Sequence, residues 1–142
     1  MSDDLETAAR VWQGLRTLVL DIHDRRKDVC DALGMSFIRI KALRMLTAGP
    51  LTLRDLAERL ATDAPYTSVV VADLERRGMV ERIANPGDRR SKLVVITDSG
   101  AEAAEAAERI LGEPPASVVA LGLADQAALD RIVTTLLGAD AV

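Results

Sequence analysis

The sequence contains very few aromatic residues, one cysteine and one histidine. Because aromatic residues make up only 2% of the chain, Leu, Val, Ile and Ala must build the core, which favours packed helices over a β-sandwich. The single cysteine, Cys30, can form neither an internal disulfide nor a cysteine-based zinc site. We therefore expect a mainly helical protein that needs no metal or cofactor.

Long apolar runs and catalytic motifs are also missing. No apolar run approaches about 18 residues, and the N-terminus has no apolar signal segment. The 142 residues show no Gly-rich phosphate loop and no Ser/His/Asp or Cys/His arrangement at a catalytic spacing. With 49% hydrophobic and 28% charged residues, the chain has the composition of one globular domain. We expect a soluble, cytoplasmic protein that does not bind membranes and is not an enzyme.

The charge is unevenly distributed along the chain. The net charge is −4, but residues 36–97 contain eleven basic and seven acidic side chains, a net charge of +4. The two flanking regions together carry −8. A basic centre between acidic ends suggests a polyanion-binding core with terminal arms that do not bind. Charge scattered over helical surfaces is an equally good explanation at this point.

Apolar surfaces near both ends of the chain predict self-association. From about Leu5 to Val29, apolar residues recur at helical spacing, which predicts one helix of about 25 residues and nearly 40 Å. So long an apolar face needs a partner, and a second copy of the chain would supply it. A last helix from about Leu123 to Leu137 carries a second large apolar face.

The central region predicts a helix-turn-helix. Apolar spacing and capping residues indicate helices over residues 37–47, 53–60 and 65–77. Thr52 and Asp55 resemble a capping box before the second helix. Pro65 suits the first turn of the third helix, and Gly78 ends it. Two short helices joined by the turn 61–64 match the helix-turn-helix arrangement.

A β-hairpin follows directly. Residues 79–83 and 92–96 have strand-like composition, and the loop 84–91 between them is rich in turn residues. Thr97 then caps another helix, from Asp98 to about Leu111. A helix-turn-helix followed by such a hairpin is a winged helix. The fold class is thus mainly α with a small β-hairpin wing.

Several motifs resemble those of the MarR family of bacterial transcription regulators. They are Leu53-Arg54-Asp55-Leu56-Ala57, Asp73-Leu74-Glu75-Arg76-Arg77-Gly78-Met79-Val80, Asp88-Arg89-Arg90-Ser91-Lys92-Leu93 and Ile96-Thr97-Asp98-Ser99-Gly100. The resemblance covers nearly the whole chain. It implies a homodimer that binds pseudo-palindromic double-stranded DNA, acts as a repressor and releases DNA when a small effector binds. It also implies N- and C-terminal dimerisation helices. We assign residues 1–35 to the N-terminal dimerisation helix, 36–97 to the winged helix-turn-helix and 98–142 to the C-terminal dimerisation helices. All three belong to one integrated domain.

The wing and the third helix supply the expected DNA contacts. Arg89 and Arg90 on a thin hairpin loop can enter a minor groove, and Asp88 is expected, by analogy with the family, to hold the Arg90 guanidinium. A solvated charged turn is the plainer interpretation. The remaining expected contacts with bases or phosphates are Arg54, Thr62, Tyr66, Thr67, Ser68, Arg76 and Lys92.

The third helix departs from the family pattern. It resembles the family's recognition helix, but Ser68-Val69 stands where Thr-Arg is frequent. A bidentate Arg is the usual guanine contact, so strong guanine recognition by this helix is not expected. We predict that Tyr66, Thr67 and Ser68 are exposed, and that the inner face carries Val69, Val70, Leu74 and also Ala72.

Two further sites are weaker hypotheses. Trp12, Arg16 and His23 lie on or beside the first helix, and in the family ligands lodge where such helices meet the winged domain. The sequence favours a structural role instead, with Trp12 in the core and Arg16 and His23 as surface or interchain partners. Cys30 near the end of that helix can be a redox sensor or an incidental thiol, and the neighbouring Asp28 and Asp31 favour the second. A winged helix that binds a protein instead of an operator is the alternative function.

Overall fold

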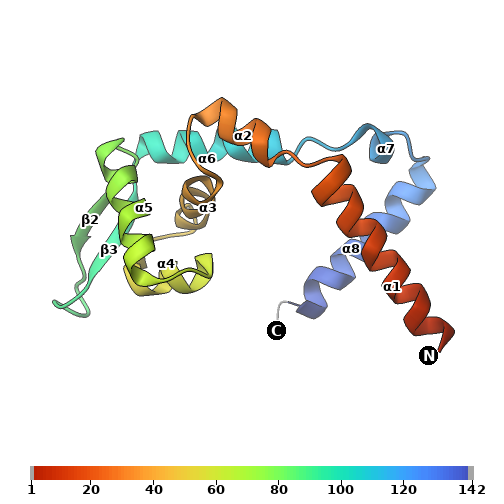
Figure 1. Cartoon of the computed structure of the whole chain (residues 1–142), viewed down its shortest axis with the longest axis horizontal. Helices are drawn as coiled ribbons and strands as arrows, with labels where there is room; N and C mark the ends of the chain where they lie inside the picture. Colours follow the sequence, from red (N-terminus) through yellow and green to blue (C-terminus); the bar gives the residue numbers. More distant parts are fainter. Residues whose placement is uncertain (1, 141–142) are drawn as a thin grey trace. The chain divides into compact units, whose positions relative to one another are not determined.

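The computed structural model describes residues 2–140 and contains two compact units, Met1–Gly112 and Glu113–Val142 (Figure 1). The helices of the first unit are α1 Asp3–Arg16, the π-helical segment η1 Thr17–Ile22, α2 Arg26–Leu33, α3 Phe37–Leu46, α4 Leu53–Leu60, α5 Ala64–Arg76 and α6 Asp98–Leu111. Its strands are β1 Leu51–Thr52, β2 Val80–Ala84 and β3 Lys92–Ile96. The second unit contains α7 Ala116–Val119 and α8 Leu123–Asp140. The mainly helical fold with a wing is confirmed.

The sheet has three antiparallel strands in the order β1-β3-β2. In the hairpin, Val80 pairs with Ile96 and Ala84 pairs with Lys92. The predicted hairpin strands agree with the structure to within one residue. The third strand, β1, was not predicted, because two residues are too few to show an alternating pattern. It pairs Leu51 with Val94 and so ties the beginning of α4 to the wing.

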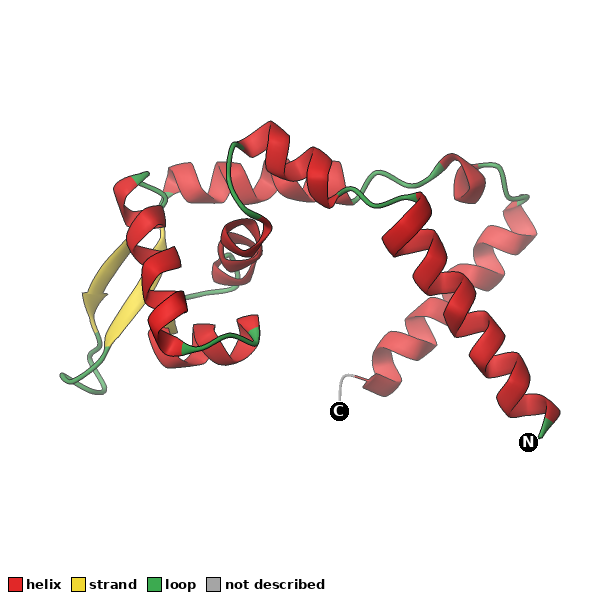
Figure 2. Ribbon diagram, in the orientation of Figure 1, coloured by secondary structure: helices red, strands yellow, loops and turns green. Residues whose placement is uncertain are grey.

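α3 forms the centre of the core, with α2 and α6 packed along it (Figure 2). Ile40 and Leu43 on α3 are fully buried, as is Leu74 on α5. Thr97 caps α6 as predicted, because its Oγ1 accepts a hydrogen bond from the Gly100 amide at 3.1 Å. The same hydroxyl donates to the Gly78 carbonyl at 2.7 Å, which fixes α6 to the turn before β2.

The prediction of one continuous N-terminal helix is wrong. The chain leaves regular helix in η1, is irregular from residue 23 to 25 and resumes as α2. Asp24 stabilises this break, because its carboxylate accepts the backbone amide of Arg26 at 3.0 Å and also binds the Arg26 guanidinium. A short acidic side chain that bonds nearby backbone amides competes with helix continuation.

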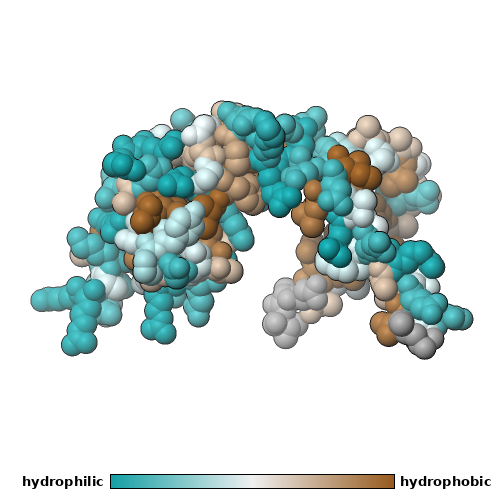
Figure 3. Space-filling model, viewed as in Figure 1, coloured by the Kyte–Doolittle hydropathy of each residue, from teal (hydrophilic) through white to brown (hydrophobic). Residues whose placement is uncertain are grey.

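The outer helices keep much of their apolar surface exposed. No residue of α1 is buried, and Trp12 is 62% exposed. On α8, Leu123 is 86% exposed and Leu137 is 67% exposed. Hydrophobic side chains reach the surface along each of these helices (Figure 3). No helix within residues 2–140 combines the length and apolar character needed to cross a membrane.

Candidate nucleic-acid interface

The helix-turn-helix formed by α4 and α5 is held by caps at both helix starts. Thr52 Oγ1 accepts the Asp55 amide at 3.1 Å, as the predicted capping box requires. Ala61 ends α4 in the left-handed region, with φ of 54°. Asp63 then begins α5 by accepting the Tyr66 amide at 2.7 Å. Asp63 is thus a structural cap, and its negative charge is also stabilised by the positive N-terminal end of the helix dipole.

The structure separates the three polar residues expected on the outer face of α5. Tyr66 is exposed, and Ser68 is half-buried, as is Thr62 in the turn. The prediction that Thr67 is exposed is wrong, because this residue is fully buried. Its hydroxyl can leave water because it donates to the Asp63 carbonyl at 2.8 Å. Thr67 therefore supports the start of α5 from within.

Val69 is the converse case. The prediction that it faces inward is wrong, because it is 58% exposed, while Val70 and Val71 are fully buried. Ala72, also expected on the inner face, is exposed as well. The run of three valines contains one more apolar residue than the inner face can accept. Once Thr67 occupies an inner position, helical spacing places Val70, Val71 and Leu74 on the same side and turns Val69 outward.

The wing loop is ordered by its own side chains. Asn85 accepts the Gly87 amide at 3.0 Å and donates to the Ser91 hydroxyl at 3.0 Å. Asp88 accepts the backbone amide of Arg90 at 2.9 Å. The expectation that Asp88 holds the Arg90 guanidinium is therefore wrong, because the hydrogen bond of Asp88 is to the main chain of Arg90. Asp88 shapes the loop and leaves the charged end of Arg90 without a bond to it.

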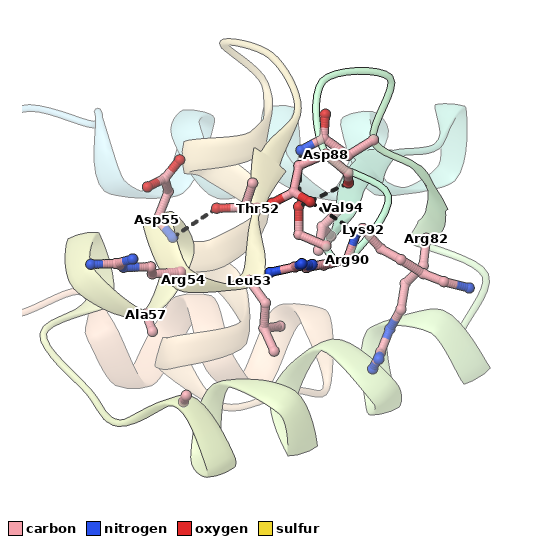
Figure 4. A pocket seen from close by; sticks show the side chains of 13 residues that line it. Thr52, Leu53, Arg54, Asp55, Ala57, Arg82, Asp88, Arg90, Lys92 and Val94 are labelled. Carbon is pink, nitrogen blue, oxygen red and sulfur yellow. Dashed lines mark hydrogen bonds between the residues drawn. The ribbon is translucent and has the colours of Figure 1, made fainter.

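A groove of about 690 Å³ lies between the wing and the helix-turn-helix (Figure 4). The beginnings of α4 and α5 line one side, and β2, β3 and the wing loop line the other. Its basic residues are Arg54, Arg82, Arg90 and Lys92, against the acidic Asp55 and Asp88. The Arg90 side chain extends towards Leu53, whereas Arg54 points away from the wing. The groove thus carries a net positive charge, and its outer edge at the hairpin tip is hydrophilic (Figure 3).

The other expected basic contacts are also exposed. Arg54, Arg89, Arg90 and Lys92 are accessible to solvent. Arg76 at the end of α5 forms an ion pair with Asp73, yet its side chain remains 75% exposed. Although Asp73 is only 15% exposed, the Arg76 guanidinium is open to solvent and can also contact an external anion. The assignment of these residues to DNA contacts stays a prediction.

In the described part of the chain, one of the expected effector residues lines a hollow beside α1 and η1. Arg16 lines a small hollow of about 240 Å³ with Gln13, Thr17, Leu20 and Asp21. Trp12 and His23 do not line this hollow. Trp12 is not a core residue of the single chain either, since it is largely exposed. The proposed ligand role of these three residues stays a prediction.

Cys30 is half-buried on α2 and packs against the hydrophobic core. This position agrees with an incidental thiol, because a reactive thiol needs access and a charge environment that favours the thiolate. The sequence analysis did not identify the ion pairs of Asp73 with Arg39 on α3 and with Arg77, the residue that follows α5. The sequence contains a signal for the Asp73–Arg77 pair only, because these two residues are four positions apart, the spacing at which side chains meet on a helix.

Comparisons with known sequences agree with this geometry. A sequence model of the MarR family matches residues 33–91. An HTH-type transcriptional regulator of Mycobacterium bovis is 31% identical over 106 residues, which cover 74% of this chain and 74% of the relative. An HTH-type transcriptional regulator of Mycobacterium tuberculosis matches to the same extent.

Solved structures share the fold over most of the chain. RV1404 of Mycobacterium tuberculosis has a TM-score of 0.79 at 19% identity, covering 99% of this chain and 97% of its own. A mutant of MarR from Escherichia coli has a TM-score of 0.73 at 25% identity, covering 88% and 95%. A MepR mutant of Staphylococcus aureus, solved bound to an oligodeoxyribonucleotide, has a TM-score of 0.66 at 22% identity, covering 91% and 96%. Sequence and fold therefore agree that the chain belongs to the MarR family of transcription regulators and is not an enzyme.

Proposed function

We propose that the protein is a homodimeric repressor that binds a pseudo-palindromic operator in the cytoplasm and is released by a small effector. The observation that carries this proposal is the basic groove, in which the beginning of α5 and the wing residue Arg90 line the same hollow. In this arrangement α5 enters a major groove while the wing reaches the adjacent minor groove. The MepR mutant, which has the same fold, was solved bound to an oligodeoxyribonucleotide, and this supports DNA as the partner.

Dimerisation rests on the exposed apolar faces of α1 and α8. Side chains such as Val11 and Trp12 on α1 and Leu137 on α8 are more than half exposed in the single chain. Patches of this kind mark interaction surfaces in soluble proteins. A two-fold dimer would place two copies of α5 about 34 Å apart, one turn of the double helix. The effector is the least supported part, because among the described residues Trp12 and His23 do not line the hollow that contains Arg16.

The test is binding of a duplex selected from a random library by the full-length protein. Arg90→Ala is expected to weaken binding by at least about tenfold, because it removes a cation from each half-site contact. The matched control is Arg109→Ala, which removes the same charge from an exposed position on α6 outside the groove. Fluorescence anisotropy at several salt concentrations measures both affinity and the number of phosphates neutralised.

The two interpretations of the winged helix give opposite results in this experiment. Equal affinities for Arg90→Ala and the wild type would contradict the wing contact. Absence of duplex binding at about 50 mM salt, where counterion release favours association, would favour the protein-binding alternative instead. The uncharged outer face of α5 is the feature that such a protein partner would use.

A further inference from the structure

The exposed face of α5 carries no charged and no amide side chain over its first nine residues. From Ala64 to Ala72 the sequence is APYTSVVVA, and the acidic cap Asp63 precedes it. Pro65, Val69 and Ala72 are exposed and recur at the four- and three-residue spacing of one helical face. Tyr66 is 44% exposed beside them. The part of α5 that would enter a major groove is therefore uncharged, with the hydroxyls of Tyr66 and Ser68 as its polar groups and the aliphatic Val69 exposed at its centre.

This composition limits what the helix can recognise. Bidentate recognition of guanine needs Arg or Lys, and bidentate recognition of adenine needs Asn or Gln. Residues 64–72 contain none of these four residue types. The group in the major groove that an apolar side chain does recognise is the 5-methyl group of thymine. An exposed valine at mid-face has the size and chemistry for that contact.

Charge around the face argues for nucleic acid as its occupant. Arg54, Arg90 and Lys92 lie in the groove that borders the beginning of α5, and Arg76 is exposed one turn beyond Ala72. An apolar strip bordered by cations matches a thymine-bearing groove bordered by phosphates. A wholly apolar protein surface would leave these cations without counter-charges.

We propose that Val69 is a specificity-determining residue, and that α5 recognises its half-site through a thymine methyl group instead of a guanine. This inference rests on the proposed function, since it presupposes an operator. Contact between Val69 and the methyl group removes both from water. The cations bordering α5 then supply affinity for phosphates without distinguishing sequences.

The experiment uses the full-length protein and the duplex that it selects from a random library. Each half-site thymine is replaced in turn by deoxyuridine, which keeps every hydrogen-bonding group of the base pair and lacks only the methyl group. One thymine in each half-site is expected to be sensitive. Its replacement in one half-site alone should weaken binding about fourfold. Replacement in both half-sites should weaken it by about 15-fold. Deoxyuridine outside the half-sites provides the DNA control.

Protein variants then assign the effect to Val69. Val69→Ala is expected to bind the thymine duplex about as weakly as the wild type binds the deoxyuridine duplex, and to lose sensitivity to the replacement. Val69→Thr keeps a methyl group at the same place and should retain most of the affinity and the sensitivity. Because Val69 is exposed, all three proteins should melt at similar temperatures.

Other outcomes separate this inference from the proposed function. If the selected duplex binds tightly but is insensitive to deoxyuridine, or if Val69→Ala keeps the full sensitivity, the inference is wrong and the repressor proposal survives. If half-sites are selected with an essential guanine under α5 and no thymine, the inference is again overturned. If no duplex is selected at all, both fall together.

Discussion

The Asp73 carboxylate on α5 pairs with three arginines, and this cluster connects α5 to α3 and α2. Asp73 binds Arg39 of α3 at 2.7 Å and Arg77 near the end of α5 at 2.8 Å, and it also pairs with Arg76. Arg77 in turn donates to the Gly34 carbonyl at the end of α2, at 3.1 Å. The Arg77 and Arg39 hydrogen bonds lower the pKa of Asp73 from 3.8 to about 2, more than burial raises it. This cluster fixes the end of α5 to the core.

Asp73→Asn is expected to lower the melting temperature at pH 7, because it removes the charge that three guanidinium groups share. The folded pKa of Asp73 is depressed, so its stabilisation is fully present above about pH 4 and is lost as the pH falls towards 2. Wild type and variant should therefore converge in stability between these pH values. Thermal melts from pH 7 to about pH 2 measure the difference.

The control for this prediction is Asp31→Asn, which removes the carboxylate of an exposed pair with Lys27 on α2. Exposed pairs contribute little to stability, so this variant should melt close to the wild type at every pH. A loss in Asp73→Asn no larger than that in Asp31→Asn would show that the cluster does not stabilise the fold.

At the scale of elements, the sequence predicts those whose signals are local. Thr52, Pro65 and Thr97 stand at helix starts, and the change from helical to alternating spacing locates the hairpin. These signals act through backbone amides within three or four residues, so they do not depend on the rest of the fold.

Three features lack a signal in the spacing of apolar residues: strand β1, the break after η1 and the orientation of Val69. β1 exists because β3 pairs with it. The break after η1 lies inside apolar spacing that continues across it, so periodicity alone does not reveal it. The orientation of Val69 depends on whether Thr67 is buried, which requires knowing that its hydroxyl reaches the Asp63 carbonyl. A substitution on the outer face of α5 is therefore misread as a core change when the sequence is the only guide.

The contact between α6 and the turn before β2 gives a second prediction. A Cβ atom added at Gly100 would lie 2.1 Å from the Met79 carbonyl oxygen and 2.7 Å from Ile96 Cγ1. Gly100→Ala must therefore move α6 away from the hairpin, at a cost of about 1–3 kcal/mol or more. Chemical denaturation measures the loss, with a shift in midpoint at constant slope.

Gly14→Ala is the matched control for Gly100→Ala. Gly14 lies inside α1, and a Cβ atom there would meet nothing within 4 Å. Ala forms helix better than Gly, so this variant should be neutral or more stable by up to about 1 kcal/mol. Equal stabilities for the two variants would mean that α6 does not pack as closely on the Met79 turn as the structure indicates.

At the scale of the whole molecule, α1 and α8 present apolar faces that the core does not use. Trp12 on α1 is 62% exposed and Leu136 on α8 is 48% exposed in the single chain. A winged helix alone contacts one half-site, with modest affinity. Linking two copies converts the second contact into an intramolecular one, which raises overall affinity by about 10²–10⁴. Dimerisation and operator binding should therefore be lost together.

Trp12→Glu and Leu136→Glu place a charge in these faces, and each is expected to yield a species of 15.2 kDa in sedimentation velocity where the wild type sediments at twice that mass. Operator affinity should fall by about 10²-fold or more in the same variants, although their winged helices are unchanged. Ser99→Glu, which adds the same charge at an exposed position in the first turn of α6, should remain dimeric and bind normally. A monomeric variant that binds its operator as tightly as the wild type would contradict binding by a dimer, because operator affinity would then not depend on linking two winged helices.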